Sequence, residues 1–141
     1  MELVDLDVDD ARWAAALPVL QELRPHLDAD ALRTVYAEGR PQGYRFLAAL
    51  DGDRCVGVAG YRVLATAFVG RRLYVDDLVT ASASRSTGVG AALLGELERR
   101  AREAGCTVLD LDSGVQRHDA HRFYLRERMH ISSHHFTKPL T

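Results

Sequence analysis

The first apolar positions of the chain alternate with acidic ones, and the next apolar positions recur at the spacing of a helix. Alternation over residues 4–8 predicts a strand, because successive side chains of a strand point to opposite faces. Asp9 or Asp10 is placed to cap the helix that follows, and Pro18 within it favours a kink or a later start. The apolar stripe that predicts this helix consists of Trp13, Leu17, Leu20 and Leu23.

A second helix and an antiparallel hairpin follow. Asp28 is placed to cap the helix, which should stop near Gly39. Residues 44–50 and 55–64 are mostly apolar, and Asp-Gly-Asp at 51–53 is a strong turn signal between them. The two runs are therefore predicted to be neighbouring antiparallel strands.

The pattern then changes from strand to helix and back to strand. Residues 72–80 predict a further strand, joined to the strand over residues 55–64 through a loop at Gly70. The apolar positions with helical spacing that follow are Val89, Leu93, Leu94, Leu97 and Ala101. Gly105 should end this helix, and residues 107–112 predict the next strand. A strand, loop, helix and strand in this order predict a parallel crossover.

A last helix over residues 120–128 and a last strand over residues 131–137 complete the predicted order. We therefore expect a mixed α/β (α+β) fold, with a mostly antiparallel central sheet of about six strands flanked by about four helices. The 141 residues suffice for one hydrophobic core, so a single domain over residues 1–141 is predicted.

The composition is typical of a globular protein, and the net charge favours a small molecule as its partner. Hydrophobic residues make up 47% of the chain and charged residues 27%. A formal net charge of -2 gives no electrostatic reason to expect nucleic acid or an anionic membrane surface as the partner. Cys55 and Cys106 are too few for a disulfide framework, and no apolar run approaches the length of a signal or membrane segment. These features favour a cytoplasmic protein.

A glycine-containing loop, Arg85–Ala91, lies between the strand over residues 72–80 and the helix after it. The first turn of a helix has N–H groups without an internal acceptor, and Gly88 and Gly90 let a diphosphate approach them. A plain helix start with flexible residues is the alternative. A Walker loop fails because alanines stand where it needs Lys and Ser or Thr, and a Rossmann fingerprint lacks its third glycine, at Leu93.

The loop resembles the R/Q-x-x-G-x-G/A signature of the GNAT superfamily of N-acetyltransferases, with matches at Arg85, Gly88 and Gly90. The resemblance implies a GNAT-like fold with acetyl-CoA as co-substrate. It also implies that the backbone of Leu78, Val79 and Thr80 pairs with the pantetheine arm and supplies an N–H to the oxyanion. The residues that it assigns to the pyrophosphate are Arg85, Ser86, Thr87, Gly88, Val89, Gly90 and Ala91.

Residues 118–124 resemble the second signature of the superfamily, N-x-x-A-x-x-L/F-Y-x-x-x-G-F, with matches at Ala120, Phe123 and Tyr124. The resemblance implies that Tyr124 contacts the sulfur of coenzyme A and protonates the leaving thiolate. The alternative is a tyrosine that only packs its helix against the sheet.

The chain departs from this second signature at both ends. Arg117 stands where the family usually has asparagine, so Ser113, Gln116 or Arg117 would have to replace its contact with the cofactor. Arg128 and Met129 stand where the family usually has Gly-Phe. These departures put the far end of the cofactor site in doubt.

Asp76 and Asp77 are the candidate proton acceptors for an ammonium substrate. In the superfamily an acidic residue on the strand before the loop, or a water that it holds, often has this role. Alternation along a strand lets only one of the two face the cleft, and Asp77 is slightly favoured. Both could instead be solvated acids at the end of a strand.

His118 and His121, followed by His134 and His135, could suggest a metal site. Their spacing matches no established zinc motif, so no metal is predicted.

The sequence as a whole predicts an acyltransferase that moves an acetyl group from acetyl-CoA to a small-molecule or peptide amine by direct attack. The first alternative is a non-catalytic acyl-CoA-binding protein of GNAT type, and the second is a dinucleotide-binding oxidoreductase. Many relatives have a seventh strand that the predicted order lacks. The open sheet edge this leaves could be covered by a second copy in a homodimer.

Overall fold

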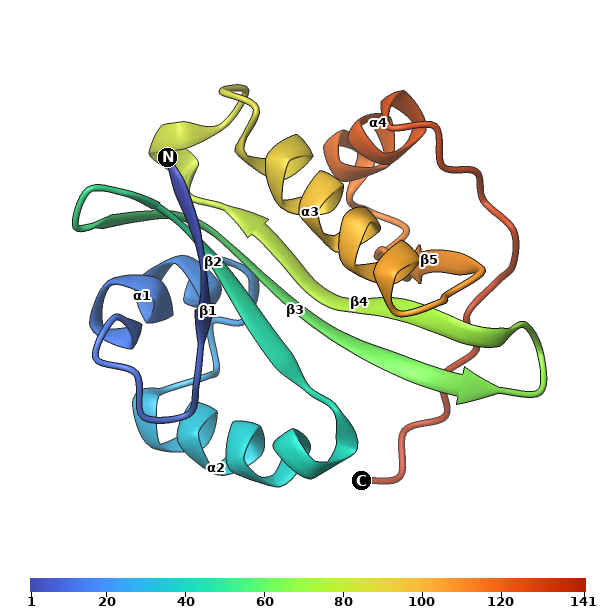
Figure 1. Ribbon diagram of the computed structural model, residues 1–141, viewed down its shortest axis with the longest axis horizontal. Coiled ribbons are helices and arrows are strands. Elements are labelled where there is room, and N and C mark those ends of the chain that lie inside the picture. The colour runs from blue at the N-terminus through green and yellow to red at the C-terminus, as the bar shows by residue number, and fades with distance from the viewer. The chain divides into compact units, whose positions relative to one another are not determined.

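Figure 1 shows the computed structural model of the protein, which describes residues 1–141. The chain divides into two compact units, residues 1–110 and residues 111–141, so a single domain stays a prediction. In chain order the main elements are β1 (Glu2–Leu6), α1 (Trp13–Leu23), α2 (Ala29–Gly39), β2 (Arg45–Asp51), β3 (Arg54–Thr66), β4 (Gly70–Thr80), α3 (Val89–Glu103), β5 (Val108–Leu111) and α4 (His118–Arg126).

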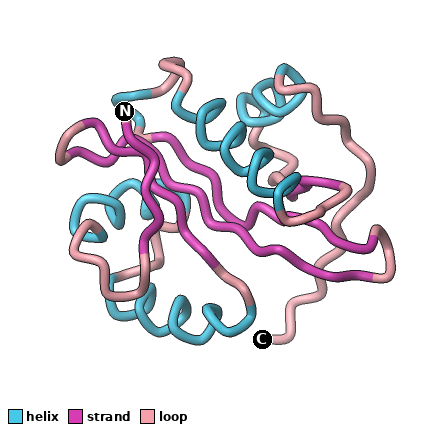
Figure 2. The backbone as a smooth tube through the Cα atoms, in the orientation of Figure 1, coloured by secondary structure: helices cyan, strands magenta, loops and turns pink.

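One sheet organises these elements, with its five strands in the order β1-β2-β3-β4-β5. Strands β1 to β4 pair antiparallel with their neighbours, and the crossover through α3 makes β5 the parallel partner of β4 (Figure 2). The predicted mixed α/β fold, its hairpin and its parallel crossover are thereby confirmed. None of the helices combines the length and the apolar composition that a membrane-spanning segment requires.

The expected last strand over residues 131–137 does not form, which leaves five strands in the sheet. Residues 130–141 have no regular secondary structure, and Ile131, Phe136 and Leu140 are 76%, 92% and 90% exposed. An extended segment without a neighbouring strand has no partners for its backbone hydrogen bonds, so apolar content alone does not make it a strand.

The two predicted helix caps have different outcomes. Asp28 caps α2 as expected, because its carboxylate accepts the Ala31 N–H at 2.8 Å. The cap prediction for α1 was wrong, since the residue before that helix is Arg12, and Asp10 accepts the Arg12 N–H at 2.9 Å. Pro18 lies within α1 and does not delay its start.

The sheet separates two packed layers within the first unit. Helices α1 and α2 pack on one face, where an aromatic cluster joins them to β2: the rings of Trp13 and Tyr36 lie 5.0 and 4.9 Å from the ring of Phe46. Helix α3 packs on the other face, and a Cβ on Gly57 would lie 2.7 Å from Val89 (Figure 1). The side chains of β4 therefore face either the α1–α2 layer or α3.

A β-bulge in β4 changes which side chains face the α1–α2 layer. Val75 lies opposite Tyr61, but Gly60 lies opposite Asp77, so Asp76 is the additional residue. Across a sheet, paired residues share a face, which places Asp77 with Gly60 instead of with Val75. Gly60 gives the carboxylate room, because a Cβ there would lie 2.3 Å from Asp77 Oδ2.

We predict that Gly60→Ala destabilises the protein by about 1–3 kcal/mol, because the added methyl group overlaps Asp77 and Phe46 in a packed layer. Urea unfolding measures the change. Gly95→Ala is the matched control: this glycine lies in α3 with open space around it, so alanine there should stabilise the fold by about 0.5–1 kcal/mol. Equal unfolding midpoints for Gly60→Ala and the wild type would contradict the packing argument.

Candidate active site

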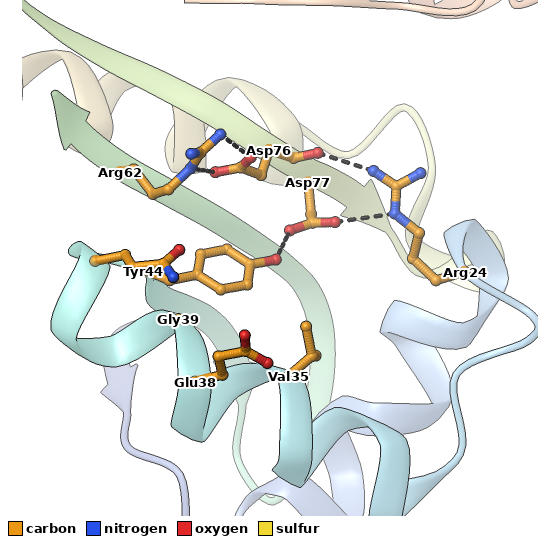
Figure 3. Close-up of a pocket in the computed structure, with 9 residues that line it drawn as sticks. Arg24, Val35, Glu38, Gly39, Tyr44, Arg62, Asp76 and Asp77 are labelled. Atoms are coloured by element: carbon orange, nitrogen blue, oxygen red, sulfur yellow. Dashed lines mark hydrogen bonds and ion pairs between the residues drawn. The ribbon is translucent and has the colours of Figure 1, made fainter. Parts of the chain in front are cut away.

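A cavity of about 410 Å³ opens between β4 and the α1–α2 layer (Figure 3). Its lining residues come from the end of α1, from α2 and the turn after it, and from β3 and β4. They are Arg24, Val35, Glu38, Gly39, Gln42, Tyr44, Arg62, Asp76 and Asp77. Five of these nine residues carry charge, so the cavity suits a polar ligand.

Asp77 lies deepest among these charges, with only 5% of its surface exposed. One carboxylate oxygen accepts a hydrogen bond from Arg24 Nε at 3.0 Å, and the other accepts from the Tyr44 hydroxyl. Burial, reinforced by the Asp77 charge, raises the pKa of Tyr44 strongly, so this phenol stays protonated and donates. Both oxygens of Asp77 are therefore held by neighbouring side chains.

Asp76 is held by a two-pronged ion pair and is more accessible. Arg62 Nε and Nη2 lie 2.9 and 2.7 Å from its two carboxylate oxygens, and its carbonyl accepts from Arg24 Nη2 at 2.9 Å (Figure 3). The side chain is 22% exposed, against 6% for Asp77. Burial raises the pKa of Asp76, although the ion pair with Arg62 acts in the opposite direction.

The expectation that only one of the two aspartates can face the cleft was wrong. Both line the cavity, because the bulge at Asp76 interrupts the alternation of β4. Sequence reasoning missed Arg24, Tyr44 and Arg62 as partners of these acids. Only Arg62 had a detectable signal, because the loop at Gly70 joins its strand to the strand of Asp76, and the two strands pair.

The loop after β4 has the geometry expected of an anion site. Gly88 has φ 87°, in the left-handed region, and a Cβ there would meet nothing within 4 Å. The first intrahelical bond of α3 runs from Ala92 N–H to the Gly88 carbonyl at 3.0 Å. The N–H groups of residues 89–91 therefore precede the first intrahelical hydrogen bond and have no acceptor within the helix.

Glu22, in α1, anchors the start of this loop. Its carboxylate accepts the Ser82 N–H at 3.1 Å and lies 4.0 Å from Arg85 Nη2. The Thr87 hydroxyl donates to the Ser84 carbonyl and so tightens the turn. The Arg85 side chain remains 67% exposed, which leaves its guanidinium accessible to a further anion.

The end of β4 keeps one backbone edge without a strand neighbour. Leu78, Val79 and Thr80 pair with β3 on one side. On the other side β5 begins where Thr107 N–H donates to the Arg71 carbonyl at 2.9 Å, and it has four residues. A strand of that length rises about 13 Å and ends before Leu78, so the polar backbone groups there are open to another extended chain.

A family comparison places this geometry among known proteins. A model described as the acetyltransferase (GNAT) family matches residues 6–129. The chain belongs to the GNAT family. It is 35% identical over 130 residues to an uncharacterized N-acetyltransferase, YhdJ, of Bacillus subtilis (strain 168), with 91% of this chain and 92% of that protein covered. This GNAT protein is accordingly an acyltransferase enzyme.

Two further comparisons have a shorter aligned segment or a lower identity. An aminoalkylphosphonate N-acetyltransferase of Salmonella typhimurium (strain LT2) is 41% identical over 66 residues, covering 47% of this chain and 43% of that protein. The aminoglycoside N-acetyltransferase AAC(6')-Iy, solved in complex with CoA, superposes with a TM-score of 0.86 at 11% identity over 98% of this chain and 93% of that one. The structural match confirms the GNAT fold.

In the second unit, Tyr124 lies on α4 and is partly buried. Burial raises the pKa of its phenol, and the nearby charge of Arg117 lowers it. Arg117, the residue before α4, thus occupies the usual asparagine position and acts on Tyr124 electrostatically. The hydroxyl of Ser113 is buried and has no hydrogen-bond partner.

Arg128 adopts the backbone of the glycine that the GNAT signature usually has there. Its φ is 67°, and its N–H donates to the Leu125 carbonyl at 3.1 Å. The Met129 N–H donates to the Tyr124 carbonyl at 3.0 Å, which completes a Schellman cap. This departure from the motif changes the side chain, but the backbone conformation that caps the C-terminus of α4 is the same.

Two histidines of the second unit, His118 and His121, contact each other and the backbone. The rings of His118 and His121 lie 5.9 Å apart, and His121 Nε2 lies 2.8 Å from the Gly114 carbonyl oxygen. No group of three or more His, Cys, Asp or Glu side chains is arranged to hold a metal ion.

We predict that the pKa of Asp76 lies above 3.8 and that Arg62→Gln raises it further, because the variant removes the charge that lowers it. The folded protein then holds this proton more tightly than the unfolded chain. Asp76 therefore favours folding below pH 3.8, and that contribution is lost as the pH rises through the folded-state pKa.

Carboxyl ¹³C shifts followed against pH by NMR measure this pKa. Arg54→Gln is the control, since Arg54 pairs with Asp51 in the β2–β3 turn and should leave Asp76 unchanged. An Asp76 pKa at or below 3.8 in the wild type would contradict the burial argument.

Proposed function

We propose that this GNAT enzyme transfers an acetyl group from acetyl-CoA to a primary amine by direct attack. The observation that carries the proposal is the order of features along one strand. The bulged pair Asp76 and Asp77 lines a polar cavity on β4, and the same strand leads into the loop whose helix-start amides are open to an anion. The acceptor site and the cofactor site would then both be positioned by strand β4.

The residues of the chain fit acetyl-CoA along its length. The amides of residues 89–91, with the Arg85 guanidinium, the Ser86 hydroxyl and the backbone of Thr87, would hold the pyrophosphate. The open backbone edge of residues 78–80 would pair with the pantetheine arm and direct an N–H at the acyl oxygen. We propose Ser113 and Arg117, both in the second unit, as further cofactor-binding residues on the resemblance to the GNAT signature.

Acetyl-CoA supplies an activated acyl carbon. In the transfer, the amine nitrogen forms a bond to this carbon, the carbon–sulfur bond breaks, and the nitrogen loses a proton while the sulfur gains one. Bound side by side, the two substrates react with a large entropic advantage. An amine acceptor is consistent with the Salmonella typhimurium relative, whose name makes it an N-acetyltransferase.

Asp76 suits the role of proton acceptor better than Asp77. It is the more exposed of the two, and burial raises its pKa, which makes it a stronger base than an ordinary carboxylate. Asp77, which is almost fully buried and bonded to Arg24 and Tyr44, would instead fix the shape of the cavity floor. The pKa of Asp76 should then reappear as the acidic limb of kcat/KM against pH.

Tyr124 suits the role of proton donor to the leaving sulfur. Burial raises its pKa, so the phenol is neutral at pH 7, and the cationic Arg117 partly offsets that shift. A phenol tuned in this way can release a proton to a thiolate and recover it from solvent.

Isothermal titration calorimetry with acetyl-CoA tests the cofactor site. We expect micromolar binding, about -8 kcal/mol, and about tenfold weaker binding for Arg85→Gln, because the variant removes a charge-assisted hydrogen bond to phosphate. Arg99→Gln is the control, since its guanidinium pairs with Glu96 and Glu103 along α3. Equal affinities for Arg85→Gln and the wild type would contradict the assignment of Arg85.

Steady-state kinetics test Tyr124. We expect Tyr124→Phe to lower kcat by about 100-fold or more while the Kd for acetyl-CoA is unchanged, because only the proton donor is lost. Tyr61→Phe is the control: its hydroxyl bonds to Arg100 at 2.8 Å on the α3 face of the sheet. A Tyr124→Phe enzyme with wild-type kcat would show that this tyrosine only packs.

A further inference from the structure

The charges around the cavity do not cancel. Arg24 pairs with Asp77 at 3.0 Å and Arg62 pairs with Asp76 at 2.7 Å, so each of these pairs is close to neutral. Glu38 is the remaining charged residue of the lining, it is exposed, and it takes part in none of the ion pairs of the protein. The cavity therefore has one uncompensated negative charge, on the α2 side.

The wall that carries Glu38 also offers an apolar contact. Val35 and Glu38 are three residues apart on α2, which places them on the same side of the helix, and both line the cavity (Figure 3). Val35 is 46% exposed, a high fraction for an apolar side chain in a lining. A ligand that lies along this wall contacts the methyl groups of Val35 and the carboxylate of Glu38.

We propose that the acceptor is an alkylamine with a second cationic group at the far end of its chain, and that Glu38 binds this second cation. The inference rests on the proposed function, since it places the reacting amine at the aspartates on β4. The alkyl chain lies along Val35, and the far ammonium or guanidinium group pairs with Glu38. An acceptor with an anionic far end is disfavoured, because Glu38 repels it.

The two arginines do not reverse this preference. Each guanidinium lies within 3.0 Å of a carboxylate oxygen, and that short distance cancels most of its field at the cavity centre. A ligand carboxylate or phosphonate would have to displace an aspartate to gain a full ion pair with Arg24 or Arg62. Glu38 has no such competitor.

Calorimetric titration of the protein, saturated with coenzyme A, compares three probes of matched length: 1,5-diaminopentane, pentylamine and 5-aminopentanoate. We expect the diamine to bind most tightly and the aminopentanoate most weakly. Glu38→Gln should weaken the diamine about tenfold and leave pentylamine unchanged, because only the charge-assisted contact is removed. Asp53→Asn, an exposed acid in the β2–β3 turn outside the cavity lining, should change none of the three.

Glu38→Lys provides a readout that a structural role would not give, since it should reverse the order and favour 5-aminopentanoate over the diamine. A wild type that binds the three probes equally, or a Glu38→Gln variant that weakens all three alike, would overturn the inference. Acetyl-CoA affinity and pentylamine acetylation are measured in parallel. If both are normal while the diamine preference is absent, only this inference fails, whereas loss of acetyl-CoA binding rejects the proposed function itself.

Discussion

The candidate site depends on one irregularity, the additional residue at Asp76 in β4. A regular strand would place Asp76 and Asp77 on opposite faces, one in the α1–α2 layer and one against the apolar side of α3. The bulge keeps both acids on the face with the cavity. Gly60 makes this possible, since any side chain there would occupy the space of the Asp77 carboxylate.

The buried Asp77 and the half-buried Asp76 lie side by side and repel each other, and the surrounding residues compensate for this repulsion. Arg24 reaches both residues, through the Asp77 carboxylate and the Asp76 carbonyl, and thereby ties the end of α1 to the bulge. Arg62 neutralises Asp76 from the neighbouring strand. Because the compensation is pairwise, the charge that faces an incoming ligand is set by a residue outside these pairs, Glu38 on α2.

The proposed cofactor site begins where the same strand ends, and it depends on a different physical principle. Where β4 ends, α3 begins with amides that no carbonyl of the helix can accept, and Gly88 turns the chain without a side chain in the way. Specific binding there requires few side chains, which is why the loop signature is short. In the second unit, Arg128 shows that backbone conformation is what the motif encodes, because a non-glycine residue adopts the left-handed turn that caps α4.

The sequence by itself determined the order of helices and strands, the hairpin, the crossover and the loop signature, because these depend on local periodicity and on residues close in the chain. It predicted a strand at residues 131–137 that does not form, since strand formation requires a neighbour that no local pattern can supply. Only the tertiary structure decided that both aspartates share a cavity and that Arg24, Tyr44 and Arg62 bind them. Those contacts join residues 14 to 53 positions apart, and a one-residue shift in strand register, invisible in the sequence, fixes which face they share.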